Sequence, residues 1–136
     1  MARILSIDYG GKRTGLAVTD PEQIIATGLT TVKTQELFTF LKKYCAAEPV
    51  ELFVIGDPLN WDLTDTHATP LVQQCIARLK KEFPQIPVVT LDERMTSKMA
   101  KQALLDMGLK KKDRRKKELV DEVAATILLQ EYLMSR

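Results

Sequence analysis

The stretch RILSIDYGGKRTGLAVTD, residues 3–20, decides which fold the sequence predicts. Its first six residues, Arg3–Asp8, form a short run rich in β-branched side chains that glycines bound, which is typical of a strand. Residues 15–20 (GLAVTD) predict a second strand that stops before Pro21, and the short glycine-bearing connection predicts a hairpin. The chain is therefore expected to begin with an antiparallel pair of strands.

Strands and helices alternate downstream of this hairpin. Further strands are predicted at Ile24–Val32, Leu52–Gly56 and Ile86–Leu91, and the second of these is a continuous apolar run of the kind buried on both faces of a sheet. Apolar residues at helical spacing predict four helices. The first is expected between Thr34, as its cap, and Pro49, the second after Thr69–Pro70, the third over 96–108 and the fourth over Glu118–Met134.

This order of elements indicates an α/β fold. The alternation after the third strand predicts parallel crossovers, whereas the first three strands predict an antiparallel meander. We therefore expect a mixed five-stranded sheet, three antiparallel strands followed by parallel ones, flanked by helices on both faces. With 136 residues, no internal repeat and no linker, residues 1–136 are expected to form one domain.

The charges are distributed unevenly along the chain. Twenty Lys and Arg against 18 Asp and Glu give a net charge of only +2. The segment Lys110–Lys117, KKKDRRKK, has seven positive residues and one negative, so it carries +6 and leaves −4 for the rest of the chain. A basic segment beside an acidic body predicts contact with a polyanion, although a solvated loop is an alternative explanation of such a run.

Several classes of protein are excluded by composition. The 45% hydrophobic and 28% charged residues are typical of a globular protein and argue against disorder. No apolar stretch approaches the roughly 18 residues of a membrane helix, and the N-terminal apolar run ends at Asp8, unlike a signal peptide. Cys45 and Cys75 lie in apolar helical patterns, which predicts reduced core thiols in a cytoplasmic protein. The lone histidine, His67, excludes a zinc site.

Carboxylates interrupt the apolar pattern at the ends of two predicted strands. Asp8 ends the first strand, and Asp92 and Glu93 end the last one within the run TLDERMTS. Ligands bind at the carboxyl ends of strands in α/β sheets. A structural explanation is also open, because Asp8 is placed to cap a turn and either member of the pair is placed to cap the next helix.

Asp121 interrupts the packed face of a helix. Its neighbours on that face are Ala124, Ala125, Leu128 and Tyr132, so the carboxylate projects inward. An inward charge is costly unless it is paired, neutralised or bound to a metal, and a salt bridge to Lys or Arg is the alternative to metal binding.

Carboxylates that converge without histidine or thiol partners suit hard cations such as Mg²⁺. Two such ions roughly 4 Å apart can activate water and stabilise the leaving oxygen of a phosphodiester. The three carboxylate positions therefore predict a magnesium-dependent chemistry on phosphate esters.

Four motifs resemble, in this order, those of the YqgF (RuvX) family: DYGGKRTGLAVTD, IGDPLNW, TLDERMTS and VDEVAATILLQEYL. The resemblance spans essentially the whole chain. It implies an RNase H-like fold related to the RuvC Holliday-junction resolvases, and a metal-dependent endo- or exonuclease. Members of the family are associated with maturation of the 5′ end of precursor 16S ribosomal RNA, and were earlier proposed as junction resolvases.

The resemblance also implies the residues of the active site. Asp8, Glu93 and Asp121 match the family's catalytic carboxylates and would hold Mg²⁺ or Mn²⁺. Glu93 is chosen over Asp92 by its similarity to the resolvases' glutamate at that strand end, which leaves Asp92 as an alternative ligand.

Basic residues flank each of these acidic positions. Lys12 and Arg13 follow Asp8, and Arg94 and Lys98 follow the acidic pair, where Arg94 is suited to grip a phosphate with two hydrogen bonds. The basic segment is expected to steer a polynucleotide toward the carboxylates in a salt-dependent, sequence-independent manner. Its predicted contacts are Lys110, Lys111, Lys112, Arg114 and Arg115. Solvated surface charges are the alternative for all of these side chains.

One loop departs from the family's pattern. Many members carry G-L-P-L after the fourth strand and then a loop with glycine, whereas here Asp57 replaces the apolar residue and NWDLTDTHATP has no glycine. Trp61 in this loop is suited either to base stacking or to packing, and His67 is expected to be a solvated loop residue rather than a general base.

Three classes of function compete on this sequence. The first is a nuclease acting on precursor ribosomal RNA, free or on ribosomal particles, or on branched DNA, as a monomer or weak homodimer with no membrane partner. The second is ATP binding by a D-x-G-G-K turn of the actin and sugar-kinase type, but that fold needs two such domains and 136 residues supply one. The third is a ribosome-assembly factor that binds RNA without cutting it.

Overall fold

The structure is a computed structural model that describes residues 2–57, 69–92 and 116–136. The strands are β1 (Arg3–Asp8), β2 (Arg13–Thr19), β3 (Ala26–Lys33), β4 (Val50–Asp57) and β5 (Val88–Asp92). The helices are the short 3-10 helix η1 (Thr34–Glu36), α1 (Leu37–Ala47), α2 (Thr69–Glu82) and α4 (Lys116–Ser135).

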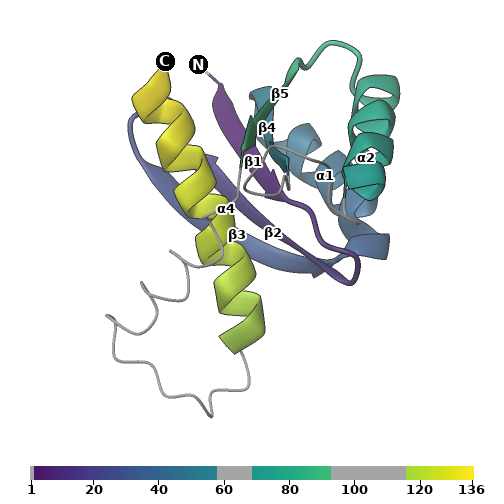
Figure 1. The fold of residues 1–136 in the computed structure, drawn as a ribbon. Helices are drawn as coiled ribbons and strands as arrows, with labels where there is room; N and C mark the ends of the chain where they lie inside the picture. Colours follow the sequence, from purple (N-terminus) through teal and green to yellow (C-terminus); the bar gives the residue numbers. More distant parts are fainter. Residues whose placement is uncertain (1, 58–68, 93–115) are drawn as a thin grey trace.

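The sheet confirms the predicted topology. Its five strands lie in the order β3-β2-β1-β4-β5. β1 pairs antiparallel with β2, and β2 with β3, whereas β4 pairs parallel with both β1 and β5. Helix α4 crosses one face of the sheet and α1 and α2 lie on the other (Figure 1). The described residues therefore form the mixed α/β architecture that the alternation of elements predicts.

Alternating side chains of β1 build a separate core on each face of the sheet. Leu5 and Ile7 are fully buried in the cluster that includes the apolar residues of α1 and α2. Ile4 belongs to the cluster on the other face, with Leu128 and Leu129 of α4. This two-residue period is the reason that the run Arg3–Asp8 is buried on both sides.

Helix α4 is joined to the sheet by a buried polar contact as well as by apolar packing. The Ser6 hydroxyl, fully buried, donates a hydrogen bond to the carbonyl oxygen of Ala125 at 2.6 Å. Nearer the start of the helix, the backbone of Asp121 lies so close to Gly15 of β2 that a Cβ built there would overlap its carbonyl oxygen. α4 therefore runs antiparallel to β1, close against the sheet at its first turns.

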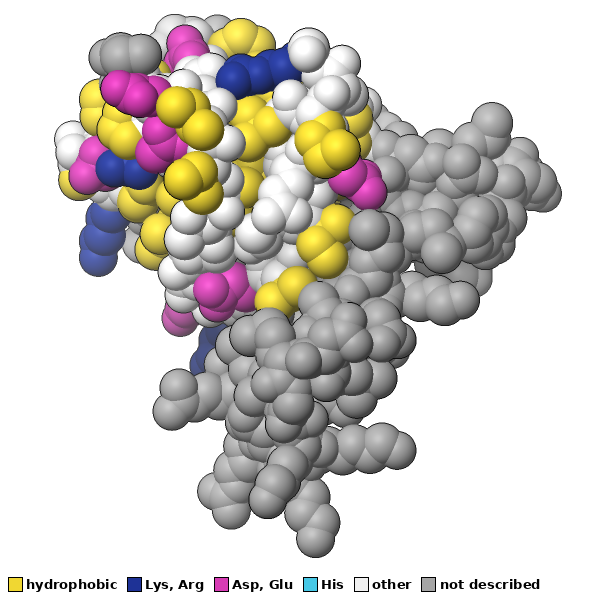
Figure 2. All heavy atoms as spheres, turned by 90° about the vertical axis from the view of Figure 1, so that its left-hand side faces the viewer, with side chains coloured by type: hydrophobic (Ala, Val, Ile, Leu, Met, Phe, Trp, Pro, Cys, Tyr) yellow, Lys and Arg dark blue, Asp and Glu magenta, His cyan; other side chains and the backbone are white. Residues whose placement is uncertain are grey.

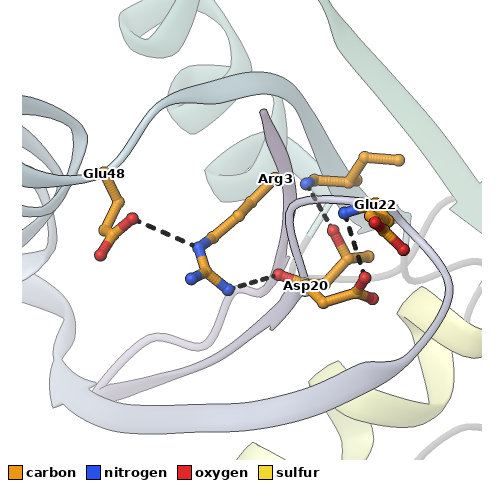
Figure 3. Close-up of polar contacts among 6 residues, drawn as sticks. Arg3, Asp20, Glu22 and Glu48 are labelled. Carbon is orange, nitrogen blue, oxygen red and sulfur yellow. Dashed lines mark hydrogen bonds and ion pairs between the residues drawn. The ribbon is translucent and has the colours of Figure 1, made fainter. Parts of the chain in front are cut away.

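The predicted third strand begins two residues later than expected. Ile24 and Ile25 are 67% and 64% exposed and belong to the turn between β2 and β3. The Asp20 carboxylate accepts backbone hydrogen bonds from Ile25, Ile24 and Glu22, and these bonds lower the pKa of Asp20. Figure 3 shows the bond from Glu22. An aspartate that satisfies three backbone N–H groups favours a turn over a strand ladder.

Arg3 ties this end of the sheet together, as Figure 3 shows. Its guanidinium donates to the carbonyl oxygen of Thr19 at 3.0 Å and lies 3.5 Å from a carboxylate oxygen of Glu48. The Thr19 hydroxyl accepts from the backbone N–H of Ile4. These contacts fix the start of β1 to the end of β2, on the side of the molecule where both chain termini lie (Figure 1).

The prediction that Thr34 caps the first helix is wrong. No side-chain cap closes η1 or α1. Instead, the Thr34 hydroxyl donates to the carbonyl oxygen of Gly10 at 2.6 Å and also lies 2.9 Å from the hydroxyl of Thr14. The side chain is used to hold the β1–β2 turn, a long-range contact that local spacing does not reveal.

The remaining elements agree with the sequence patterns within the described residues. α2 begins at Thr69, and α4 includes the whole predicted range Glu118–Met134 and begins at Lys116, so the last two residues of the basic segment are helical. The predicted helix over 96–108 lies outside the described residues. Cys75 is buried and Cys45 half-buried, both as free thiols, and burial raises the pKa of Cys75 to about 12.

Among the residues that the structure describes, the large apolar side chains that are exposed are Ile24, Ile25, Leu71 and Met134. On the face that Figure 2 presents, hydrophobic side chains are interspersed with polar and acidic ones. Within the part of the chain that the structure describes, no helix has the length and apolar character needed to cross a bilayer.

Substituting Gly15 with alanine is expected to destabilise the protein by about 1–3 kcal/mol, because the added methyl group would push the first turns of α4 off the sheet. Gly11→Ala is the matched control, since a Cβ at Gly11 meets open space, and its effect should stay within about 0.5 kcal/mol. Urea unfolding of both variants measures the difference. Equal free energies of unfolding would show that α4 does not depend on this close approach.

Candidate active site

Asp8 lies at the carboxyl end of β1, on the face that α4 covers. Ile4 and Ser6, four and two residues earlier, contact α4, so the alternation of the strand directs the Asp8 side chain to the same side. Asp8 is half-buried. The carboxylate therefore stands at the edge of the sheet, between the sheet and the first turns of the helix.

Asp121 reaches the same place from α4. It precedes Ala125 by four residues, about 6 Å along a helix, and Asp8 follows Ser6 by two residues, about 7 Å along a strand. Because Ser6 is bonded to Ala125 and the two elements run antiparallel, Asp8 and Asp121 lie at the same level.

Gly15 provides an independent measure of this proximity. It is the residue of β2 directly opposite Asp8, and such partners have Cα atoms about 5 Å apart. The backbone of Asp121 packs on Gly15 itself. The structure thus brings two of the three predicted catalytic carboxylates together.

Arg13 is bound to one of these carboxylates. Its Nε donates to Oδ2 of Asp121 at 2.9 Å, and the two side chains are 36% and 23% exposed. The salt bridge to Lys or Arg that the sequence predicted as one explanation of the inward Asp121 is therefore formed. A carboxylate has about four acceptor positions, and the bond from Arg13 uses one of them.

The ends of β4 and β5 extend the same edge of the sheet. Ile7 of β1 pairs with Ile55 of β4, and Asp57 of β4 pairs with Asp92 of β5. Because adjacent strands are about 4.8 Å apart, the end of β5 lies about 10 Å from the end of β1. Glu93, the third predicted ligand, follows directly on β5 but lies outside the described residues.

The predicted phosphate-binding residues are described only in part. Lys12 is exposed in the β1–β2 turn beside Arg13. The others lie outside the described residues: Arg94, Lys98, Lys110, Lys111, Lys112, Arg114 and Arg115. Trp61 and His67 of the loop after β4 also lie outside them.

The region also contains two polar residues, Lys33 and Gln35, that the sequence patterns did not single out. An open hollow of about 480 Å³ is lined by Gly11, Lys12, Arg13, Lys33 and Gln35. Lys33, at the end of β3, is the partner of Arg13 across the β2–β3 ladder. The signal that could have found Lys33 is the hairpin register, which the glycine and the bulge in this pair of strands obscure in the sequence.

The donor set at this edge of the sheet is made of carboxylate oxygens. Within residues 2–57, 69–92 and 116–136, no group of three His, Cys, Asp or Glu side chains is close enough to hold a metal ion. Asp8 and Asp121 supply two oxygen donors, and oxygen donors are those that Mg²⁺ and Mn²⁺ prefer. The residues present fit a divalent hard cation whose coordination further carboxylates or water would complete.

The fold and the position of this site define an RNase H-like protein. The solved structure "T. thermophilus RuvC in complex with Holliday junction substrate" is similar with a TM-score of 0.60 over 99% of this chain and 96% of that chain, at 18% identity. The chain matches the RuvX family, described as Holliday junction resolvase, over residues 2–135. It belongs to the RuvX family.

Relatives in other bacteria are similar over their whole lengths. A protein named "Putative pre-16S rRNA nuclease" from Phocaeicola vulgatus is 53% identical over 136 residues, which is 100% of this chain and 98% of the relative. One of the same name from Christiangramia forsetii is 52% identical over 133 residues, with 98% of each chain covered. The expectation of membership in this family is confirmed.

The bond between Arg13 and Asp121 should be measurable as a coupling free energy. In a double-mutant cycle with Arg13→Ala and Asp121→Ala, we expect about 1 kcal/mol in urea unfolding, because the pair is only partly exposed. The pair Arg78 and Glu82, four residues apart in α2 with side chains 58% and 19% exposed, is a reference pair within one helix, for which about 0.3–0.5 kcal/mol is expected. Additive effects of the two substitutions would contradict the pairing.

Proposed function

We propose that this protein is a divalent-metal-dependent nuclease whose substrate is precursor 16S ribosomal RNA. The observation that carries the proposal is the convergence of Asp8 and Asp121 at the carboxyl end of the sheet, beside a turn that holds Lys12 and Arg13. The names of the relatives and the description of the family support a hydrolase acting on nucleic acid.

Electrostatics explains why such a site requires cations. Two carboxylates at the same level of a partly desolvated edge repel each other, and both repel the phosphodiester that they would have to approach. A hard divalent cation removes both problems, since it binds carboxylate and phosphate oxygens together. When bound, Mg²⁺ or Mn²⁺ would supply an activated water and stabilise the leaving oxygen.

The residues of this chain divide the remaining tasks. Asp8 and Asp121 would hold the metal, and Glu93, with Asp92 as the alternative, would complete the ligand set from the end of β5. Arg13 restrains the orientation of Asp121 through its bond to Oδ2 and places positive charge beside the expected scissile phosphate. We assign this positioning role to Arg13 in addition to phosphate contact.

Basic residues would guide the nucleic acid to these carboxylates. Lys12 is exposed beside the site, and Arg94 and Lys98 follow the acidic pair in sequence. The last two residues of the segment Lys110–Lys117 are the first two residues of α4, and Lys117 precedes Asp121 by four residues. Contacts of this kind bind phosphates without reading sequence, so we expect affinity that depends strongly on salt.

A four-way DNA junction is the second candidate substrate. The specific observation in its favour is the similarity of the fold to T. thermophilus RuvC, whose solved structure is a complex with a Holliday junction substrate, together with the description of the RuvX family. The names of the relatives favour RNA instead. A third possibility, binding of RNA without cleavage, would replace both nuclease functions.

Incubation with labelled precursor 16S RNA and with a four-way DNA junction, each with and without Mg²⁺ or Mn²⁺, tests the proposal. We expect cleavage of the RNA that requires the metal. Asp8→Asn and Asp121→Asn should each lower the rate by at least about 10²-fold, because each removes a charge on which the metal depends.

Glu51→Gln is a matched control, since Glu51 is an exposed carboxylate on β4 away from the carboxyl end of the sheet, and it should retain activity. Cleavage of the junction alone would replace RNA with branched DNA as the substrate. Binding of RNA without cleavage under every metal condition would contradict the nuclease and favour an assembly factor.

A further inference from the structure

Lys33 and Gln35, which line a basic hollow beside the carboxylates, have no role in the chemistry described so far. The hollow has a volume of about 480 Å³ and is lined by the end of β3 and the β1–β2 turn. Three of its five lining residues are the cations Lys12, Arg13 and Lys33, and Gln35 adds a side-chain amide. The guanidinium of Arg13 belongs to both places, because it lines the hollow and bonds to Asp121.

The hollow is held in shape by hydrogen bonds between its two walls. The backbone N–H of Thr34, between Lys33 and Gln35, donates to the carbonyl oxygen of Lys12 at 3.0 Å. The hydroxyl of Thr34 donates to Gly10 and contacts the hydroxyl of Thr14. The cations are therefore carried by a backbone that is fixed before any ligand arrives, which lowers the entropic cost of binding.

The placement of Lys33 is unfavourable for the isolated protein. Lys33 and Arg13 are direct partners across the β2–β3 ladder, so their side chains leave the same face of the sheet about 5 Å apart. Like charges directly opposite destabilise an antiparallel pair. Asp121 offsets the charge of Arg13, and an anion in the hollow would offset the charges of Lys33 and Lys12 as well.

We propose that Lys33 and Gln35, together with Lys12, form a binding subsite for the phosphodiester backbone next to the scissile position. The proposal rests on the proposed nuclease function, because the shared Arg13 joins this hollow to the carboxylates. The substrate backbone passes over the ends of β2 and β3, on the side of Asp8 opposite to β4 and β5. An ammonium group and a side-chain amide both donate to phosphate oxygens without reading the base.

Binding of RNA to an inactive background tests this subsite without interference from cleavage. In Asp8→Asn protein, we compare Lys33→Ala, Lys33→Glu and Gln35→Ala with Lys43→Ala and Lys43→Glu. Lys43 is also an exposed lysine, in the second half of α1. The probe is a labelled single-stranded RNA from the 5′ end of precursor 16S RNA, titrated over a series of salt concentrations.

We expect Lys33→Ala to weaken RNA binding several-fold at low salt and to make the slope of log K against log salt shallower by about 0.7, the value of one phosphate contact on a single strand. Lys33→Glu should weaken binding further, and Gln35→Ala should lower affinity without changing the slope. The Lys43 variants should bind as the background does. The midpoint temperature of thermal unfolding of the Lys33 variants should be unchanged or slightly higher, because the substitution relieves repulsion with Arg13.

One outcome is that the unsubstituted protein cuts RNA and the Asp8→Asn background binds it, but the Lys33 and Lys43 variants have equal affinities and slopes. This outcome would overturn the subsite and leave the proposed nuclease function intact. Failure of the unsubstituted protein to bind or cut RNA would overturn both. A reduction in affinity for the Lys33 variants accompanied by an equal reduction for the Lys43 variants would show a general charge effect and would also overturn the subsite.

Discussion

The close approach of α4 to β2 at Gly15 is the constraint on which the site depends. Gly15 lies opposite Asp8 in the sheet and directly beneath the backbone of Asp121, so the absence of a side chain at Gly15 brings two residues 106 positions apart in the sequence into contact. The hydrogen bond from Ser6 to Ala125 fixes the helix along its axis at the same time. Close packing thus converts two separate carboxylates into a pair.

Nearby cationic side chains lower the free-energy cost of placing Asp8 and Asp121 close together in the folded protein. Arg13 neutralises Asp121 directly, and Lys12 and Lys33 raise the local potential from the adjoining turn and strand. The same cations are suited to attract a phosphodiester, and a divalent metal would link that phosphate to the carboxylates. Within the described residues, acidic groups (Asp8 and Asp121) and basic groups (Lys12, Arg13 and Lys33) therefore meet at one edge of the sheet.

Local patterns predicted the mixed sheet, with three antiparallel strands followed by parallel ones, and the inward direction of Asp121, because burial of strands and helix faces leaves periods of two and 3.6 residues in the sequence. Other features depend on register, which those periods do not encode. The partner of Asp121 is Arg13, 108 positions away, and Lys33 gains its significance only by standing opposite Arg13. Thr34 has the position of a helix cap but bonds to the β1–β2 turn. Ile24 and Ile25 have strand-like side chains, yet the bonds to Asp20 hold them in a turn.

The central claim is that Asp8 and Asp121 together bind a divalent cation, and calorimetric titration with Mn²⁺ tests it most directly. The unsubstituted protein should bind the ion, and Asp8→Asn and Asp121→Asn should each weaken binding by at least about tenfold while their circular dichroism spectra remain unchanged. Equal Mn²⁺ affinity in the unsubstituted protein and in both variants would contradict the claim.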